Sequence, residues 1–310
     1  MRILHISDIH IFCPGAITLP KVINKRFLGL VNWYLKRHHT VNYRLLDLLL
    51  STIPTLSPDV ICVTGDLAHL GQEEEFKIVA RWLSELERFA PVKLVPGNHD
   101  LYVHEAALYL QRYLKVFFSI SQRTSFHEED LSDLFPQVDV FEDAALIGLS
   151  SAYVCGWALA TGRLGQRQLN ALSSALDAVS DKGLARIILI HHPPIAGFVK
   201  KRKALLDIND LEQVVASRGA ELFLFGHSHR RYNYLQVRPK LKILFLCAPA
   251  ITSIKKEGSQ RAGFYLIDIK KTKVDGSSWN TSVMDFVLAD DKKSFVRQKE
   301  FNISLGTSSD

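Results

Sequence analysis

Five short apolar runs in this sequence each end in a cluster of polar residues. The runs are RILHI (2–6), DVICVTG (59–65), VKLVPG (92–97), ARIILIHH (185–192) and AELFLFGH (220–227). Runs of this length, rich in β-branched and aromatic residues, predict buried strands. Helical patterns lie between them, over 42–53, 73–88, 104–118, 166–179 and 210–218. Buried strands that alternate with helices predict an α/β fold with layered, largely buried sheets.

The sequence after Gly226 is typical of consecutive strands with few helices. These strands are YNYLQV (232–237), KILFLCA (242–248), GFYLIDI (263–269) and SVMDFVL (282–288), and DVFEDAALIGLSS (139–151) predicts two more strands joined by a tight turn. With 47% hydrophobic residues, the chain has enough apolar material for a large core. Since no repeat or long linker divides the chain, we expect a single domain over 1–310. Within it, 11–46 would be a basic amphipathic insertion and 270–310 would be C-terminal strands and a tail.

The polar clusters carry the residue types of a metal site. The candidate ligands are Asp8, His10, Asp66, Asn98, His191, His227 and His229. Ligand sites in α/β sheets lie at the carboxyl ends of the strands, so these side chains would converge there. Carboxylates and neutral imidazoles suit divalent cations such as Mn, Fe, Zn or Co. This set is too large for one tetrahedral ion and suits two ions about 3.5–4 Å apart.

Local geometry supports the same interpretation. Residues i and i+2 of a strand point to one face, which would align Asp8 with His10 and His227 with His229. The glycines that precede Asp66, Asn98 and His227 would permit sharp turns and a close approach of the backbone. A single Asp-x-His or Gly-Asn-His-Asp could be an ordinary strand end or turn. Five such clusters in series indicate a metal site.

The series DIH, GD, GNHD, HH and GHSH resembles the signature of the calcineurin-like metallophosphoesterases over residues 3 to about 269. The resemblance implies a four-layer αββα sandwich with a two-metal centre, in which Mn is preferred and Fe, Zn or Co are alternatives. It also implies that Asp66 bridges two sites, one completed by Asp8, His10 and His229 and the other by Asn98, His191 and His227. His191 is preferred to His192 because the family pattern is His-x-Pro.

The resemblance also implies a mechanism. Two cations would lower the pKa of a shared water, and the resulting hydroxide would attack phosphorus in line with the leaving oxygen. His99 would lie beside the phosphate near Asn98, where it would hydrogen-bond an oxygen or protonate the leaving group, and Asp100 would orient it. The alternative for His99 is a structural role behind the ligands.

The positive charge of the chain is concentrated in one segment. The net charge is +6, and the segment from Ile11 to Leu46 contains six Lys and Arg residues and no Asp or Glu. Within it, KVINKRFLGLVNWYLKRHH (21–39) has the apolar spacing of an amphipathic helix with a basic face. We expect membrane or acyl-chain contacts from its apolar residues, which include Phe27, Leu30, Val31, Trp33 and Tyr34. The alternative is a helix that packs on the core and keeps its basic face in solvent.

Two further stretches are candidates for phosphate binding. Lys200, Lys201, Arg202 and Lys203 follow the fourth strand closely and could bind phosphates or an anionic surface, or form a solvated loop. Arg163, in ATGRLG (160–165), is another candidate, with a surface position at a helix start as the alternative.

These features together favour a substrate that is both phosphorylated and lipidic. One branch of the family, the bacterial UDP-2,3-diacylglucosamine pyrophosphatases of lipid A synthesis, is similar in layout, including the stretches RFLGLVNWYLKR and ATGRLG. This resemblance implies hydrolysis of UDP-2,3-diacylglucosamine to UMP and 2,3-diacylglucosamine 1-phosphate. With no signal peptide and no long apolar run, the chain would be cytoplasmic and peripheral on the inner membrane face.

Three alternatives belong to different classes. A soluble cyclic-nucleotide phosphodiesterase of the same fold would use the insertion only as structure. A DNA nuclease is disfavoured because the charge outside the insertion is balanced and no separate DNA-capping domain is visible. A non-catalytic membrane-binding module is disfavoured because the set of candidate ligands is intact.

Overall fold

The strands follow one path that curls into two sheets packed face to face. The computed structural model describes residues 1–14, 25–119, 134–239, 241–255, 258–272 and 278–306. The first sheet has the order β3 (Val92–Leu94), β2 (Val60–Val63), β1 (Arg2–Ile6), β10 (Gly263–Lys271), β11 (Ser278–Leu288), β12 (Phe295–Gly306). The second has the order β4 (Gln137–Val140), β5 (Ala144–Gly148), β6 (Ala185–Leu189), β7 (Leu222–Phe225), β9 (Leu241–Cys247), β8 (Tyr232–Arg238). Among the described residues, the ladder between β12 and β9 that joins the two sheets consists of the pair Gly306 and Lys242.

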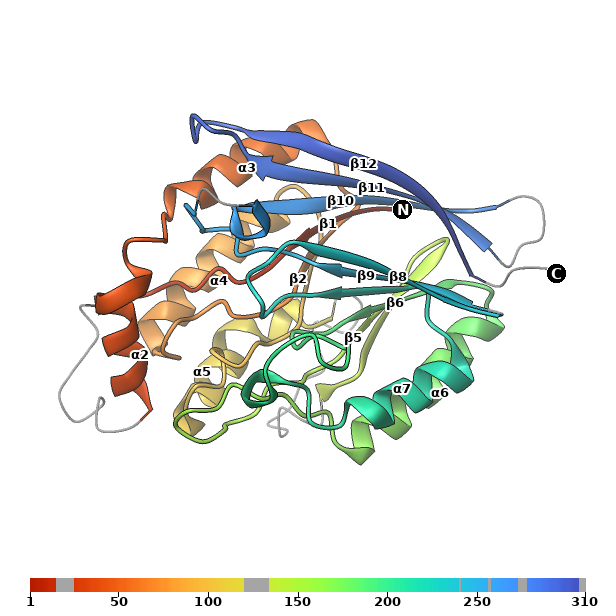
Figure 1. Ribbon diagram of the computed structural model, residues 1–310, viewed down its shortest axis with the longest axis horizontal. Coiled ribbons are helices and arrows are strands. Elements are labelled where there is room, and N and C mark those ends of the chain that lie inside the picture. The colour runs from red at the N-terminus through yellow and green to blue at the C-terminus, as the bar shows by residue number, and fades with distance from the viewer. Residues whose placement is uncertain (15–24, 120–133, 240, 256–257, 273–277, 307–310) are drawn as a thin grey trace.

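Helices cover both outer sides of the two sheets, which confirms the predicted αββα sandwich. Figure 1 shows α3 (Arg44–Leu56), α4 (Glu73–Glu87) and α5 (His104–Leu114) on one side, and α6 (Gln166–Asp181) and α7 (Ile208–Arg218) on the other. The predicted insertion helix corresponds to α2 (Arg26–Asn32) and the π-helical turn η2 (Trp33–Arg37) at the periphery of the molecule. Residues 21–24 of that prediction lie outside the described residues.

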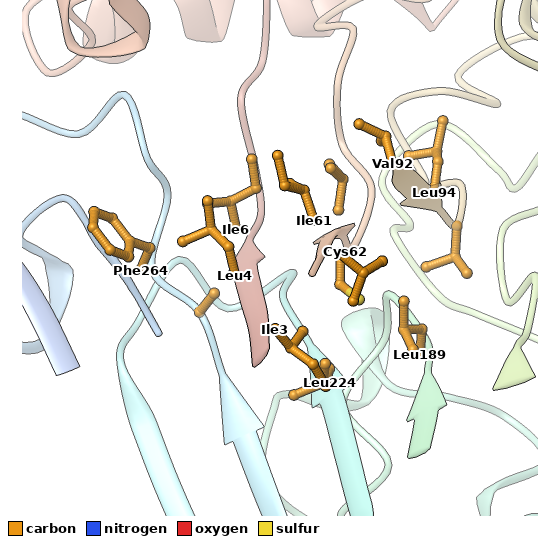
Figure 2. Packing of buried hydrophobic residues seen from close by; sticks show 14 of the residues in the cluster. Ile3, Leu4, Ile6, Ile61, Cys62, Val92, Leu94, Leu189, Leu224 and Phe264 are labelled. Atoms are coloured by element: carbon orange, nitrogen blue, oxygen red, sulfur yellow. The ribbon is translucent and has the colours of Figure 1, made fainter. Parts of the chain in front are cut away.

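The core explains why the strands are continuous apolar runs. In β6, Ile187 and Leu189 belong to the layer between the sheets, together with Ile3 and Leu224 (Figure 2). The alternate residue Ile188 belongs to a second cluster beneath α6 and α7. Both faces of such a strand are buried, so its sequence is almost continuously apolar, and the one polar residue of β6, Arg186, is paired with Glu221.

The strands are shorter than the apolar runs that predicted them, and this changes how the polar clusters are built. β1 ends at Ile6 and β7 ends at Phe225, so the residues that follow lie in turns. Asp8, His10, His227 and His229 all have positive φ angles, of 56°, 52°, 65° and 55°. The prediction that they align by strand alternation was therefore wrong, because tight turns with left-handed backbone orient them. A backbone conformation that is costly for residues other than glycine is typical of functional sites.

β12 lies in the segment 270–310, where strands and a tail were predicted, but its bounds could not be recognised in the sequence. Its middle residues, from Val296 to Asn302, are exposed or half-buried, so they do not form an apolar run. β12 nevertheless pairs with β11 along its whole length. Edge strands with one solvated side lack the signal that revealed β1 or β7.

Candidate metal centre

Among the described residues, His10, His69 and His99 form one group of potential metal ligands. Two further groups converge at the carboxyl ends of β1, β2, β6 and β7. One contains Asp8, His10, Asp66 and His229, and the other contains Asp66, His191 and His227. Within each group, the potential ligand atoms lie within 4.8 Å of one another. Asp66 belongs to both groups.

Distances between donor atoms fit two divalent cations. Nε2 of His10 lies 3.0 Å from Nε2 of His229, and Nε2 of His191 lies 3.2 Å from Nδ1 of His227. Two nitrogens bound to one ion at about 2.0–2.1 Å are expected to be about 3.0–3.4 Å apart. The Oδ1 atom of Asp66 lies 3.3 Å from His191 Nε2 and its Oδ2 atom lies 3.6 Å from His10 Nε2. Each oxygen therefore faces one group, as a bridging carboxylate requires.

Two further observations support this fit. Asn98 is buried, and its Oδ1 atom has no hydrogen-bond donor among the described residues, which is costly unless a cation or solvent binds it. His191 donates from Nδ1 to the carbonyl of Thr64 over 2.6 Å, which directs its Nε2 atom toward Asp66. The residues thus fit a dinuclear divalent metal centre, which when bound would supply Lewis acidity and an activated water.

The electrostatics of the centre keep most of the ligands, but not His191, in the protonation state that binds a cation. Burial opposes ionisation of Asp66, but His191 and His99 outweigh it and hold the pKa of this carboxyl well below its usual value. Burial lowers the pKa of the imidazoles of His10 and His227, so both are neutral. His191 is also buried, but the Asp66 carboxylate raises its pKa to about 9. His191 must therefore lose a proton before Nε2 can bind a cation.

Glycines allow the turns that carry these ligands to approach each other closely. A Cβ atom at Gly226 would lie 2.5 Å from Oδ2 of Asp8, and one at Gly97 would lie 2.3 Å from Oδ1 of Asp66. The backbone N–H of His227 then donates to Oδ2 of Asp8 over 3.0 Å. The sequence prediction of close backbone approach at these glycines is confirmed.

The predicted partner of His99 was wrong. Asp100 accepts hydrogen bonds from the backbone N–H groups of Leu67 and Ala68, both at 2.9 Å, and thereby fixes the turn after β2. The ring of His99 instead contacts the carbonyl oxygen of His69 through Nδ1, at 2.7 Å. With Nδ1 held, Nε2 of His99 has no hydrogen-bond partner among the described residues, and burial lowers the pKa of the ring to about 4.

His69 and Arg37 are neighbours of the centre that the sequence reasoning missed. His69 is fully buried and its ring stacks on that of His99, with 5.3 Å between centroids. Its Nδ1 atom lies 3.3 Å from Nη1 of Arg37, and Nη2 of Arg37 lies 3.4 Å from Nε2 of His229. The only signal in the sequence is the position of His69 three residues after Asp66, which does not distinguish it from a core histidine.

The predicted phosphate-binding residues separate into two groups. Lys203 lines a cavity of about 320 Å³ that also contacts His10 and His229. Lys200, Lys201 and Arg202 precede it on an exposed turn. Arg163 lines a different cavity of about 500 Å³, whose described lining includes none of the metal-group residues.

The insertion buries two of its cations and exposes much of its apolar side. Lys25 and Arg26 are buried, and Arg26 donates to the carbonyls of Leu70 and Gly71 at 3.0 and 2.7 Å. The basic side is therefore only partly in solvent, where Lys36 remains exposed. The apolar side chains that are exposed instead are Phe27, Leu28, Val31, Tyr34 and Leu35. Among the described residues, no helix is long and apolar enough to cross a bilayer.

Trp33 and Leu30 differ from the other predicted lipid contacts. Trp33 is only 8% exposed, and its ring packs 4.3 Å from that of Phe12 and 5.0 Å from that of His69. Leu30 is half-buried in the same cluster. The buried position of Trp33 does not agree with the predicted membrane contact. Its side chain instead packs the insertion against His69, beside the metal centre.

Comparisons with known proteins agree with this geometry. Residues 1–231 match the family of calcineurin-like phosphoesterases. The chain is 28% identical over 179 residues to a probable cyclic nucleotide phosphodiesterase of Rhodopseudomonas palustris, covering 56% of this chain and 58% of that protein. It is 27% identical to a probable glycerophosphodiester phosphodiesterase of Arcobacter nitrofigilis, covering 74% and 72%.

A solved structure shows the same fold over the whole chain. It is that of a dimetal phosphatase from Danio rerio, with a TM-score of 0.60, 12% identity and 98% of each chain covered. With the family match, this fold and the two ligand groups that share Asp66, the chain belongs to the calcineurin-like phosphoesterases and is a metal-dependent hydrolase.

Proposed function

We propose that this protein hydrolyses the diphosphate of a lipid-linked nucleotide, and that its substrate is UDP-2,3-diacylglucosamine. The products would be UMP and 2,3-diacylglucosamine 1-phosphate, formed at a membrane surface. The observation that carries this proposal is the proximity of three features: the metal centre, a cationic cavity and an exposed apolar helix.

The cavity is suited to an anionic group larger than one phosphate. Its described lining contains Lys36, Arg37, Lys203 and Lys255 and no carboxylate. Four cations around about 320 Å³ attract and orient phosphates. Polar side chains such as Asn32 and Gln260 complete the lining and could hydrogen-bond a nucleoside or sugar.

The apolar surface begins within one helical turn of that cavity. In η2, Tyr34 and Leu35 are 56% and 70% exposed, whereas Arg37 lines the cavity. An amphipathic surface with exposed aromatic residues and nearby Lys is typical of helices that lie in a lipid interface. A substrate with a diphosphate and acyl chains could thus contact both regions at once.

The roles of the chain's own residues follow from their positions. Asp8, His10, Asp66, Asn98, His191, His227 and His229 would hold the cations, preferably Mn. Because Nδ1 of His99 donates to the carbonyl of His69, Nε2 would assist the leaving oxygen only once an anionic phosphoryl group has raised the pKa of the ring so that it is protonated. Lys203 would offset the charge of the phosphates.

A cyclic-nucleotide phosphodiesterase is the second candidate. It is favoured by the similarity to the Rhodopseudomonas protein, which carries that description. For this activity, the apolar face of α2 would have no part in catalysis.

One experiment separates the two candidates. The purified protein, with Mn or with chelator, would be given UDP-2,3-diacylglucosamine in mixed micelles or cyclic AMP in buffer, and phosphorus NMR and mass spectrometry would identify the products. We expect Mn-dependent release of UMP and no turnover of cyclic AMP. Turnover of cyclic AMP alone would support the second candidate, and activity that persists in chelator would contradict both.

A further inference from the structure

We propose that Arg37, which the insertion contributes, binds an oxygen of the phosphoryl group that undergoes hydrolysis. This inference rests on the proposed function, because it requires a phosphoryl substrate at the metal centre. It makes the insertion part of the active site as well as a surface for lipid.

The guanidinium of Arg37 contacts a member of the first ligand group. Nη2 is 3.4 Å from Nε2 of His229, which belongs to the group with Asp8, His10 and Asp66. Arg37 and His229 line the same cavity, so a molecule in that cavity can contact both. No other Arg side chain lines this cavity among the residues that the structure describes.

Arg37 lacks the anion that a shielded guanidinium requires. Its hydrogen-bond partners are ring nitrogens of His69 and His229, at 3.3 and 3.4 Å. Within the described ranges, no carboxylate lies within 4.0 Å of the guanidinium, although Asp8 and Asp66 act on it from further away. Burial lowers the pKa of Arg37, and these two carboxylates only partly oppose this. A planar guanidinium with several N–H donors and no carboxylate is suited to binding a phosphoryl group.

The position of Arg37 is fixed before any substrate binds. Its carbonyl oxygen accepts hydrogen bonds from the backbone N–H and the Oγ1 hydroxyl of Thr40, at 2.8 and 3.0 Å. Trp33, one helical turn earlier, packs on Phe12 and His69. A charged donor held in place by the fold stabilises developing charge with little reorganisation.

The cationic neighbour Lys203 reinforces this arrangement. Burial lowers the pKa of Lys203, and the charge of Arg37 lowers it further. The side chains of Arg37 and Lys203 line the same cavity, so their positive charges repel each other in the absence of ligand. An anionic phosphoryl group between them would relieve that repulsion.

The test uses Arg37→Ala, Arg37→Lys and Arg37→Gln, with Arg44→Ala as the matched control. Arg44 is an exposed arginine of the same insertion. Hydrolysis of bis(p-nitrophenyl) phosphate would be assayed in the presence of Mn. Mass spectrometry would measure the metal content, and calorimetry would measure the binding of inorganic phosphate to the metal-free proteins. Arg37→Gln and Arg37→Lys retain a long polar side chain in case the alanine variant does not fold.

We expect Arg37→Ala to lower kcat/KM about 100-fold at unchanged metal content and to weaken phosphate binding about tenfold or more. Arg37→Lys should lie between Arg37→Ala and the wild type, because a point charge replaces a bidentate donor. Added guanidinium ion should restore part of the activity of Arg37→Ala, whereas a structural role would show no such rescue. Arg44→Ala should behave as the wild type.

Three results would overturn the inference. These are wild-type kinetics and phosphate binding in Arg37→Ala, loss of activity that matches a loss of bound metal, and an equal effect of Arg44→Ala. If the wild type itself shows no metal-dependent hydrolysis, the proposed function is wrong, and the calorimetry on metal-free protein still decides whether Arg37 binds phosphate.

Discussion

Asp66 is the residue on which both ligand groups depend. Its two oxygens face His191 and His10, and the backbone N–H of His99 donates to Oδ1 over 2.8 Å. A neutral amide of the same shape would keep the packing but would lose the charge and one of the two ligating oxygens. The effect of such a change is therefore a test of the bridge alone.

We predict that Asp66→Asn binds fewer than two metal ions per chain and loses at least about 100-fold in kcat. Losing an outer partner of a metal ligand typically costs about 10–100-fold, and loss of a bridging ligand should cost more. Metal analysis and assays with Mn would measure both effects. Asp181→Asn, at the exposed end of α6, is the control. Full activity with two bound ions in Asp66→Asn would contradict the bridging role.

Single residues also show what sequence can reveal about the site. Asp8 and Asp66 were predictable because each follows a buried strand in a fixed motif. His69 and Arg37 were not, because their role arises from a contact between segments 32 residues apart in sequence. Likewise, Asp100 stands beside His99 in the chain but contacts other groups. Adjacency in sequence does not determine which side chain a turn orients.

At the level of helices and strands, periodicity reveals which residues share a face but not which face points inward. The spacing in 21–39 separated the apolar and basic sides of α2 and η2 only in part, because Trp33 is buried with Arg26 and Lys36 is exposed. An ordinary surface helix would bury the apolar face. Here the interior offers the carbonyls of Leu70 and Gly71 and those of Cys155 and Leu159, which hold Arg26 and Lys25. The acceptors come from distant loops, so the local sequence could not predict this orientation.

The outward apolar face leads to a prediction about membranes. We expect the double variant Tyr34→Glu, Leu35→Glu to lose at least about tenfold in affinity for vesicles with anionic lipid, since each exposed apolar side chain contributes about 1.5–3 kcal/mol when buried. Co-sedimentation would measure binding. Hydrolysis of bis(p-nitrophenyl) phosphate should change little, because neither side chain is part of the cavity lining.

A matched control for this variant lies on another helix. Ile78 of α4 is 39% exposed, so Ile78→Glu adds a charge to an apolar surface position away from the insertion. Its vesicle binding should equal that of the wild type. Equal binding by all three proteins would show that α2 is not a lipid-binding surface.

On the scale of the whole molecule, the metal centre connects two packed units. Asp8 and Asp66 follow strands of the first sheet, and His191 and His227 follow strands of the second. Within the described residues, the backbone ladder joins the sheets at only one register pair, Gly306 with Lys242, and side chains such as Lys93 and Tyr265 add hydrogen bonds between them. The apolar layer between the sheets supplies most of the remaining contact. Cations bound at the centre would therefore stabilise the same interface.

Metal removal should consequently lower the melting temperature. Ligand at about 100 times its Kd stabilises a folded protein by about 2.7 kcal/mol, which corresponds to several degrees for a domain of this size. We predict a melting temperature at least about 5 °C higher with Mn than with chelator, measured by scanning calorimetry. Asp66→Asn lacks the charge shared by both groups. The difference between its melting temperatures in Mn and in chelator should therefore be less than half that of the wild type. The same melting temperature in Mn and in chelator would mean that the clustered carboxylates and imidazoles do not bind the metal in the folded state.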